Sequence, residues 1–304
     1  MTDPAAPIQP GGVDWRSLYP FASHFLTLDA GRYHYLDEGS GETLLLVHGN
    51  PTWSFYWRNL VLALRDHCRL VVPDHMGCGL SDKPGDYDYR LSQHIDNLTR
   101  LVDELDLRQV SLVAHDWGGA IGMGVASRRP ERFSRFVLCN TAAFRSQLIP
   151  WRIAACRIPV LGKLAVQGLN GFARAALWMA TEHPEKFTPA VRAGYLAPYD
   201  SWSNRIATHR FVVDIPLDPQ HPSYETLFDV ERGLAKFRTH PMLLIWGMKD
   251  WCFSPAFLER FLEFFPQAEV ERVNDAGHYV IEDASERIVP WIEAFMARHP
   301  LSAP

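Results

Sequence analysis

The sequence predicts an α/β fold with a mostly parallel central sheet, helices on both faces, and a helical cap inserted before the last two strands. The first observation behind this prediction is that short apolar runs alternate with helix-length segments along most of the 304 residues. Such alternation is typical of parallel strands joined by crossover helices. The second observation is that the alternation stops at about Phe144 and resumes only after about Leu234. The stretch between these positions is therefore expected to be an insertion.

Before the break, the sequence predicts six strands and three helices. The strand-like runs are short and rich in apolar residues: 24–28, 32–36, 43–47, 69–72, 110–114 and 133–138. The run 43–47 is almost continuously apolar and ends at a His-Gly turn, which is typical of a strand buried on both faces. The helix-like segments are 57–64, 93–105 and 120–127. In the second of them, Ile95, Leu98 and Val102 recur at helical intervals.

After the break, the pattern of the core resumes with two strands and two helices. The strands are predicted at 242–246 and 268–273, and the helices at 255–264 and 286–297. The chain is therefore divided into three parts: a first part of the core at 1–144, a helical cap at 145–234, and a second part of the core at 235–304. Residues 1–18 are expected to be mobile, because the first dozen are rich in Pro and Gly.

The composition excludes several functional classes. The net charge is −5, and no basic cluster could track phosphates, so nucleic acid is not an expected partner. The five cysteines are scattered, odd in number and never at metal-ligand spacing, which predicts buried reduced thiols rather than a metal site. The N-terminus lacks the features of a secretory signal, and no apolar run approaches the roughly 20 residues of a membrane span. We therefore expect a soluble cytoplasmic protein without metal or other cofactor.

The most informative stretch is His115-Asp116-Trp117-Gly118-Gly119, which follows a predicted buried strand and precedes a predicted helix. Small residues around a central reactive side chain are typical of a nucleophile elbow, the sharp strand-to-helix turn that presents this side chain above the sheet. The central residue is usually Ser, but here it is Asp116, which the N-terminus of the following helix would stabilise as an anion. On this motif alone, Asp116 could equally be a helix cap.

A second candidate element is His48-Gly49-Asn50-Pro51, directly after the predicted strand 43–47. A loop in this position can turn its backbone N–H groups toward the elbow, so the amides of Asn50 and Trp117 could form an oxyanion hole. The side-chain amide of Asn50 and the indole N–H of Trp117 are also uncharged donors that could hold a departing halide or carboxylate. The alternative is an ordinary Asn-Pro turn.

Two further candidates follow the last predicted strands. His278 ends the stretch Asn274-Asp275-Ala276-Gly277-His278 after the strand 268–273, where a fold of this kind supplies its general base. Asp250 follows the strand 242–246 and would orient His278 and stabilise its imidazolium. The order nucleophile, acid, histidine is the one expected for this architecture. The sequence therefore predicts Asp116, His278 and Asp250 as catalytic residues.

Together these segments resemble the haloalkane dehalogenase family, which has the α/β-hydrolase fold. The similarity covers about residues 19–292 and rests on the Asp116 motif and on His48-Gly49-Asn50-Pro51, with Trp53 and Phe55 after it. In that family the Asp displaces the leaving group, and a water activated by the His then hydrolyses the ester intermediate. The resemblance implies a role for each matched residue: Asp116 as nucleophile, His278 as base, and Asn50 and Trp117 as leaving-group binders.

Some relatives in this family place the supporting acid one strand earlier. The equivalent stretch here, Leu138-Cys139-Asn140-Thr141, has no carboxylate, which favours Asp250. Within the family the chain looks most similar to the branch that includes the β-lactone decarboxylases of bacterial long-chain olefin biosynthesis. Three stretches suggest this: 140–144, 197–202 and 250–253. The resemblance implies a cis-3-alkyl-4-alkyloxetan-2-one substrate that gives a long-chain cis-alkene and carbon dioxide.

Three other functions stay open. Hydrolysis of haloalkanes to alcohol and halide uses the same carboxylate. Epoxide hydrolases share the His-Gly-x-Pro and Asp-Trp-Gly-Gly strings and need two cap tyrosines, for which Tyr195 and Tyr199 could serve. The alternative outside the enzymes is a non-catalytic ligand-binding protein with this fold. Such a protein would be free to lose its catalytic residues, whereas this chain retains them.

Apolar and aromatic residues of the predicted cap indicate an apolar pocket, and therefore an apolar small-molecule substrate. The alternative is that these residues pack the cap helices onto the sheet. They are Ile149, Trp151, Leu161, Leu164, Leu169, Phe172, Leu177, Trp178 and Met179.

Overall fold

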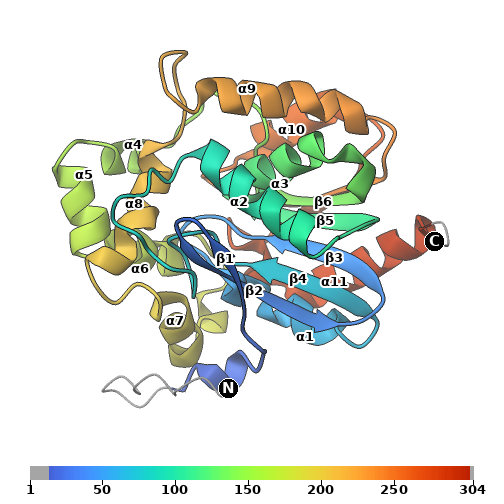
Figure 1. Cartoon of the computed structure of the whole chain (residues 1–304), viewed down its shortest axis with the longest axis horizontal. Helices are drawn as coiled ribbons and strands as arrows, with labels where there is room; N and C mark the ends of the chain where they lie inside the picture. Colours follow the sequence, from blue (N-terminus) through green and yellow to red (C-terminus); the bar gives the residue numbers. More distant parts are fainter. Residues whose placement is uncertain (1–13, 302–304) are drawn as a thin grey trace.

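The computed structural model describes residues 14–301, which contain an eight-stranded sheet between two layers of helices (Figure 1). The strands are β1 His24–Leu28, β2 Gly31–Gly39, β3 Glu42–Val47, β4 Cys68–Pro73, β5 Val110–Asp116, β6 Phe133–Thr141, β7 Met242–Gly247 and β8 Glu269–Val273. Their order in the sheet is β1-β2-β4-β3-β5-β6-β7-β8. β2 pairs antiparallel with β1 and with β4, and every other neighbouring pair is parallel. The prediction of a mostly parallel sheet is confirmed.

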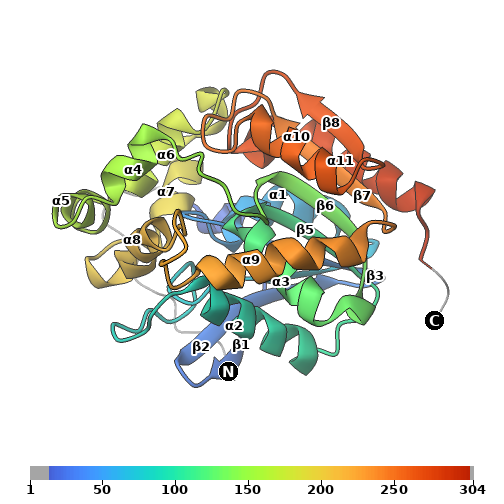
Figure 2. The same ribbon diagram turned by 90° about the horizontal axis from the view of Figure 1, so that it is seen from above.

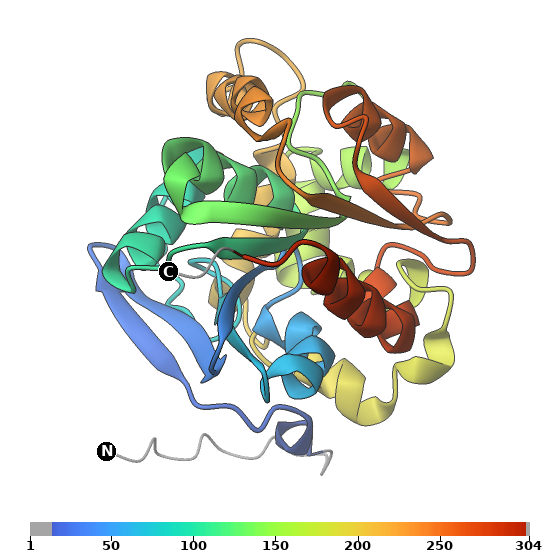
Figure 3. The same ribbon diagram turned by 90° about the vertical axis from the view of Figure 1, so that its right-hand side faces the viewer.

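Alternation of side chains along each strand explains why the sheet separates two apolar cores. Leu44 and Leu46 of β3 pack on one face, whereas Leu45 and Val47 pack on the other. Because successive side chains point to opposite faces, an apolar strand of this kind needs a helix layer on each side. Figure 3 shows the two layers. One contains α1 (Arg58–Leu64) and α11 (Val280–Arg298), and the other contains α2 (Leu91–Glu104), α3 (Trp117–Arg128), α9 (Tyr224–Gly233) and α10 (Pro255–Phe264).

Two core helices begin at least three residues earlier than predicted. The helix predicted at 120–127 is α3, whose first turn is Trp117-Gly118-Gly119. Glycine is a poor helix former, so the sequence pattern hides this turn. The helix predicted at 286–297 is the second part of α11, which begins at Val280 and bends at the non-helical Ala284. Both early turns lie next to candidate site residues.

Short helices form the cap over the C-terminal edge of the parallel strands (Figure 2). They are α4 Trp151–Cys156, α5 Leu161–Lys163, the π-helix η4 Leu164–Gly168, α6 Gly171–Met179, α7 Pro189–Leu196 and α8 Ile206–Val213. As expected for an insertion, the described chain forms no strand between β6 and β7. α9 falls within the predicted cap but packs against α2 and α3 of the core. The division at residue 234 stays a prediction, and α9 lies with the core helices.

The predicted mobile segment, residues 1–18, overlaps the described chain at residues 14–18. Its mobility stays a prediction, and the structure packs this overlap against the core. Trp15 meets the ring of Trp53 edge-on with centroids 5.7 Å apart, and η1 (Arg16–Leu18) packs against α7. Aromatic contact of this kind holds the segment although Pro and Gly precede it. Residues 1–13 of the predicted mobile segment lie outside the described residues. In the part of the chain that is described, no helix is long and apolar enough to cross a membrane.

The turn at the end of β5 is the sharpest feature of the C-terminal edge. Asp116 has φ 54° and ψ −128°, a conformation that residues other than glycine rarely adopt. The turn requires small neighbours: a Cβ on Gly118 would collide with the carbonyl of Val47, and a Cβ on Gly49 with the Asp116 carboxylate. α3 can therefore start directly against the end of β3.

Replacement of Gly118 by Ala should destabilise the fold, because the added methyl group would meet the backbone of β3, which cannot move aside. We expect the free energy of unfolding in denaturant to fall by about 3 kcal/mol, as for an overpacked core position. Gly85→Ala is the matched control, since no heavy atom lies within 4 Å of a Cβ at Gly85. This control should change stability by no more than about 0.5 kcal/mol. Equal stability of the two variants would contradict this account of the turn.

Candidate active site

Three titratable side chains from separate loops meet at the C-terminal edge of the sheet. Asp116 ends β5, Asp250 follows β7, and His278 follows β8, and all three are buried. His278 Nδ1 lies 2.8 Å from Asp250 Oδ2, and His278 Nε2 lies 3.6 Å from Asp116 Oδ2. An imidazole between an orienting carboxylate and a second reactive group is the geometry of acid, base and nucleophile. The structure thus brings together the three residues that the sequence predicts as catalytic.

Asn50 and Trp117 complete this group through their backbone. The Asn50 N–H donates to Asp116 Oδ1 over 2.7 Å, and the Trp117 N–H is a second backbone donor to the same carboxyl group. The side-chain amide of Asn50 donates to the Thr208 carbonyl of α8 over 3.1 Å, and its Oδ1 is buried without a hydrogen-bond partner in the described residues. One of the two amide protons of Asn50 is therefore already engaged, and the other is free to meet a ligand.

Burial raises the pKa of Asp116 above its usual value, because the charged form loses its hydration. The charge of His278 and the backbone donors of Asn50 and Trp117 act in the opposite direction. These groups therefore stabilise the anion at a position where burial alone favours the neutral acid. A carboxylate that is poorly hydrated but held by fixed donors suits nucleophilic attack.

For His278, burial by itself lowers the pKa, but the carboxylates of Asp250 and Asp116 outweigh it and raise the pKa above its usual value. Asp250 acts both through its charge and through its hydrogen bond to Nδ1. The imidazolium form is thus stabilised between two carboxylates. It places a positive charge beside Asp116.

Asn140 is a site residue that the sequence analysis missed. Its Nδ2 donates to Asp250 Oδ2 over 3.0 Å and to the Gly247 carbonyl over 3.1 Å, while its Oδ1 accepts from the Gly247 N–H over 2.8 Å. The Cys252 N–H binds the other oxygen of Asp250 over 2.6 Å. Both carboxylate oxygens of Asp250 thus accept hydrogen bonds from groups other than His278. The only available signal was an Asn at the position where some relatives carry the acid.

A second missed residue, Asp283, holds the loop that carries His278. This buried carboxylate accepts from the Gly277 N–H over 2.8 Å and from the Glu182 N–H over 3.1 Å, and it also binds the Thr181 hydroxyl. The loop is thereby joined to the cap just after α6. No local motif marks this role, because the cap partners of Asp283, Thr181 and Glu182, are about 100 residues away in sequence.

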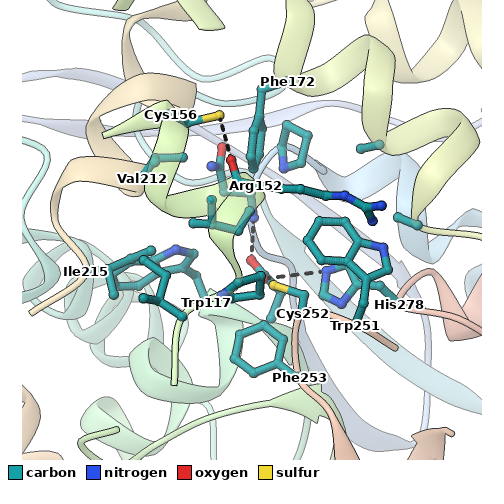
Figure 4. A pocket seen from close by; sticks show the side chains of 18 of the residues that line it. Trp117, Arg152, Cys156, Phe172, Val212, Ile215, Trp251, Cys252, Phe253 and His278 are labelled. Atoms are coloured by element: carbon teal, nitrogen blue, oxygen red, sulfur yellow. Dashed lines mark hydrogen bonds and ion pairs between the residues drawn. The ribbon is translucent and has the colours of Figure 1, made fainter. Parts of the chain in front are cut away.

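A cavity of about 290 Å³ opens above Asp116 and runs under the cap. Figure 4 looks into it, with Trp117, Cys252 and His278 at its base and Phe172 of α6 across from them. Most of the lining is apolar, and the few polar exceptions include Asn50 and His278 beside Asp116 and Arg152 of the cap. A pocket of this kind fits an apolar small molecule with one reactive polar group.

The predicted cap residues divide into three groups. Ile149, Phe172 and Met179 line the cavity, and Leu177 is buried in the core. The other five are exposed on the surface of the cap, which neither interpretation of the sequence anticipated: Trp151, Leu161, Leu164, Leu169 and Trp178.

The two cap tyrosines do not serve as donors to the cavity. The Tyr195 hydroxyl donates to Glu282 Oε1 over 2.6 Å, and the Tyr199 hydroxyl donates to the Thr52 carbonyl over 3.2 Å. Both rings are buried, and neither lines the cavity. Protonation of an epoxide oxygen by this pair is therefore not supported by the structure.

All five cysteines are free, and three of them are buried as predicted. Cys156 and Cys252 are only partly buried, because both lie at the cavity. Within residues 14–301, no group of three or more His, Cys, Asp or Glu side chains is placed to hold a metal ion.

Replacement of Asp250 by Asn should lower the pKa of His278, because it removes the charge that does most to offset burial. We expect the ring resonances of His278, followed by NMR in a pH titration, to show loss of the proton at a lower pH in the variant than in the wild type. Asp275→Asn removes an exposed carboxylate from the same loop and should leave this titration unchanged. An unchanged His278 titration in Asp250→Asn would contradict the assignment.

Comparison with known proteins places these features in a family. A family model described as the alpha/beta hydrolase fold matches residues 42–285. The crystal structure of the haloalkane dehalogenase DatA from Agrobacterium tumefaciens C58 superposes with a TM-score of 0.82 at 28% sequence identity. The superposition covers 91% of this chain and 96% of that chain.

Curated relatives are similar over nearly their whole length. The cis-3-alkyl-4-alkyloxetan-2-one decarboxylase of Shewanella oneidensis is 45% identical over 286 residues, which cover 92% of this chain and 90% of the relative. Haloalkane dehalogenase 2 of Mycobacterium tuberculosis is 36% identical over 278 residues, which cover 89% of this chain and 93% of the relative. The chain therefore belongs to the α/β-hydrolase-fold enzymes of the haloalkane dehalogenase family, in the branch that contains the β-lactone decarboxylases.

Proposed function

We propose that this enzyme decarboxylates cis-3-alkyl-4-alkyloxetan-2-ones to cis-alkenes, with Asp116 as its nucleophile. The observation that carries the proposal is a buried carboxylate, held by two backbone amides, at the base of an apolar cavity. The 45% identity to a decarboxylase of this name supports the choice of substrate. We also propose that the enzyme acts in the cytoplasm on an apolar small molecule, without a cofactor or nucleic-acid partner.

The first step opens the four-membered ring. Asp116 Oδ2, the oxygen that does not accept from Asn50, attacks ring carbon C4 and forms an ester. The C4–O1 bond breaks, and its electron pair stays on O1, so the ring carbonyl carbon becomes part of a free carboxylate. The uncharged donors on the Asn50 and Trp117 side chains are suited to hold this new anion.

The second step releases both products without water. The bond between C3 and the carboxylate carbon breaks, and its electron pair forms the C3=C4 double bond. The C4–O ester bond breaks at the same time, so Asp116 recovers its electron pair and carbon dioxide leaves. Attack with inversion at C4 sets the ester oxygen opposite the carboxylate across the C3–C4 bond. Elimination from this geometry keeps the two alkyl groups on one side and gives the cis-alkene.

His278 assists this cycle as a cation. Its raised pKa favours the imidazolium, and its Nε2 lies 3.6 Å from Asp116 Oδ2. The positive charge stabilises Asp116 as it departs from C4 and becomes an anion again. Asp250 positions and charges His278, and Asn140 fixes Asp250 through the bond of 3.0 Å.

Haloalkane hydrolysis is the second candidate, favoured by the 36% identity to a haloalkane dehalogenase. In that reaction Asp116 would expel a halide, and His278 would then have to be neutral to take a proton from water. The 45% identity to a decarboxylase, against 36% to this dehalogenase, is the reason for placing hydrolysis second.

A direct comparison of substrates tests the proposal. The purified enzyme is given a cis-β-lactone and a long-chain bromoalkane in parallel, and alkene, carbon dioxide and halide are measured. We expect alkene and carbon dioxide from the lactone, with a kcat/KM far above that for halide release. Asp116→Ala should lose at least about a thousandfold in lactone turnover, since it has no covalent route.

Asp275→Ala is the control for removal of a carboxylate, because Asp275 is exposed and lies outside the cavity. It should turn over the lactone at the wild-type rate. Efficient halide release without alkene would replace decarboxylation by dehalogenation. Near wild-type turnover by Asp116→Ala would contradict both reactions at this carboxylate.

A further inference from the structure

Large exposed apolar side chains are concentrated on the cap. Ten of the twelve such residues in the described chain lie between residues 148 and 202. Trp151 and Leu169 are each 75% exposed, although tryptophan and leucine are usually buried. We call the surface formed by six of these residues the cap face: Trp151, Val160, Leu161, Leu164, Leu169 and Trp178. Apolar patches of this kind on a protein surface mark sites of interaction.

The cap face is carried by neighbouring elements. Four of its residues lie in α4, α5, η4 and α6, whereas Val160 lies in the turn before α5 and Leu169 in the turn before α6. These four elements contact one another in series. They form the left-hand edge of the molecule in Figures 1 and 2, away from the helix layers of the core. The face is therefore open to a partner without any rearrangement of the core.

Val160 at the turn between α4 and α5 supports a functional origin of the cap face. This residue has φ 66° and ψ −59°, the rare γ-turn conformation closed by the Leu161 N–H donating to the Pro159 carbonyl over 2.7 Å, and it is 69% exposed. Gly would satisfy this backbone conformation at lower cost. An exposed β-branched side chain thus stands where the turn itself favours glycine.

The charge around the cap face is one-sided. Residues 146–181 contain four basic and no acidic residues, although the whole chain has a net charge of −5. Within residues 14–301, no ion pair engages Arg152, Lys163 or Arg174, and all three are exposed. The Lys163 ammonium instead lies 5.7 Å from the ring centre of Trp202, itself 45% exposed. Cations interleaved with Trp and Leu match an interface that is anionic at its surface and apolar beneath.

The cavity reaches the surface beside the cap face. Leu148 and Met179 line the cavity and are also exposed, at 59% and 41%. Arg152 lines the cavity as well and lies next to Trp151. An apolar molecule could therefore pass between the cap face and Asp116 over an almost continuous apolar path.

We propose that the cap face docks on the surface of an anionic lipid bilayer, so that apolar substrate and product exchange with the lipid through the cavity. The exposed Trp, Val and Leu side chains enter the boundary between headgroups and acyl chains, and the neighbouring Lys and Arg side chains meet the lipid phosphates. A protein partner is less well matched, because the segment 146–181 that supplies the cap face has four basic residues and no acidic one. The docking requires only an apolar ligand and does not depend on which bond Asp116 attacks.

Flotation with lipid vesicles tests this proposal with the full-length protein. The vesicles contain phosphatidylcholine alone, or equal parts of phosphatidylcholine and phosphatidylglycerol. Wild type should float with the mixed vesicles roughly tenfold better than with phosphatidylcholine alone, and added salt should weaken the preference. The variant V160N/L161Q/L169Q should lose binding by about tenfold or more. It should fold with a Tm close to that of the wild type, because all three side chains are exposed.

Charge variants and distant controls complete the test. K163E/R174E should lose the preference for anionic vesicles, whereas R238E, an exposed cation far from the cap face, should keep it. L62Q removes an exposed leucine from α1 and should bind vesicles like the wild type. Turnover of a short-chain, water-soluble lactone should be unchanged in all of these variants, so failure of the proposed reaction is seen separately from failure of docking.

Three results would overturn the proposal. The first is that wild type binds neither kind of vesicle. The second is that V160N/L161Q/L169Q binds as well as the wild type. The third is that the same variant converts a wild-type oligomer to a monomer in light scattering while neither protein binds vesicles, which would make the cap face a contact between copies of this chain.

Discussion

The hydrogen bond of 2.7 Å from the Asn50 amide to Asp116 Oδ1 is the contact on which the rest of the site depends. It joins the ends of β3 and β5, and it stabilises as an anion a carboxyl group that burial would otherwise protonate. This hydrogen bond is possible only because two neighbouring positions are glycines without a Cβ. Gly49 leaves room for the carboxylate, and Gly118 lets α3 begin against the carbonyl of Val47. The strained backbone of Asp116 is the local consequence of this close approach.

From this contact, fixed groups extend outward to both the sheet and the cap. Asn140 holds Asp250, Asp250 holds His278, and Asp283 joins the His278 loop to the residues that follow α6. Asp116, Asn140, Asp250 and His278 lie at the ends of four neighbouring strands, so the parallel order of β5, β6, β7 and β8 is what brings them together. Asp283 is added from α11. The cap then supplies little polar chemistry of its own. It excludes water and provides the apolar walls of the cavity.

The sequence predicted the parts of this arrangement that have local signals. The elbow around Asp116 and the loops with Asp250 and His278 could be located because each follows a recognisable buried strand. The bonds of Asn140 could not, because they depend on how β6 lies against β7. Helical periodicity likewise cannot tell whether an apolar side chain faces a core, a cavity or the outside. For that reason the exposure of Trp151 and Leu169 emerged only from the structure.

The central claim is that Asp116 carries the substrate as an ester and releases it without water. A single-turnover experiment with the β-lactone in water enriched in heavy oxygen tests this claim. The reaction is stopped at successive times, and the mass of the peptide that contains Asp116 is measured by mass spectrometry. The account predicts a transient adduct with the mass of the intact lactone, followed by a return to the original mass with no heavy oxygen incorporated. Turnover with no adduct on this peptide, or a return with heavy oxygen in Asp116, would contradict it.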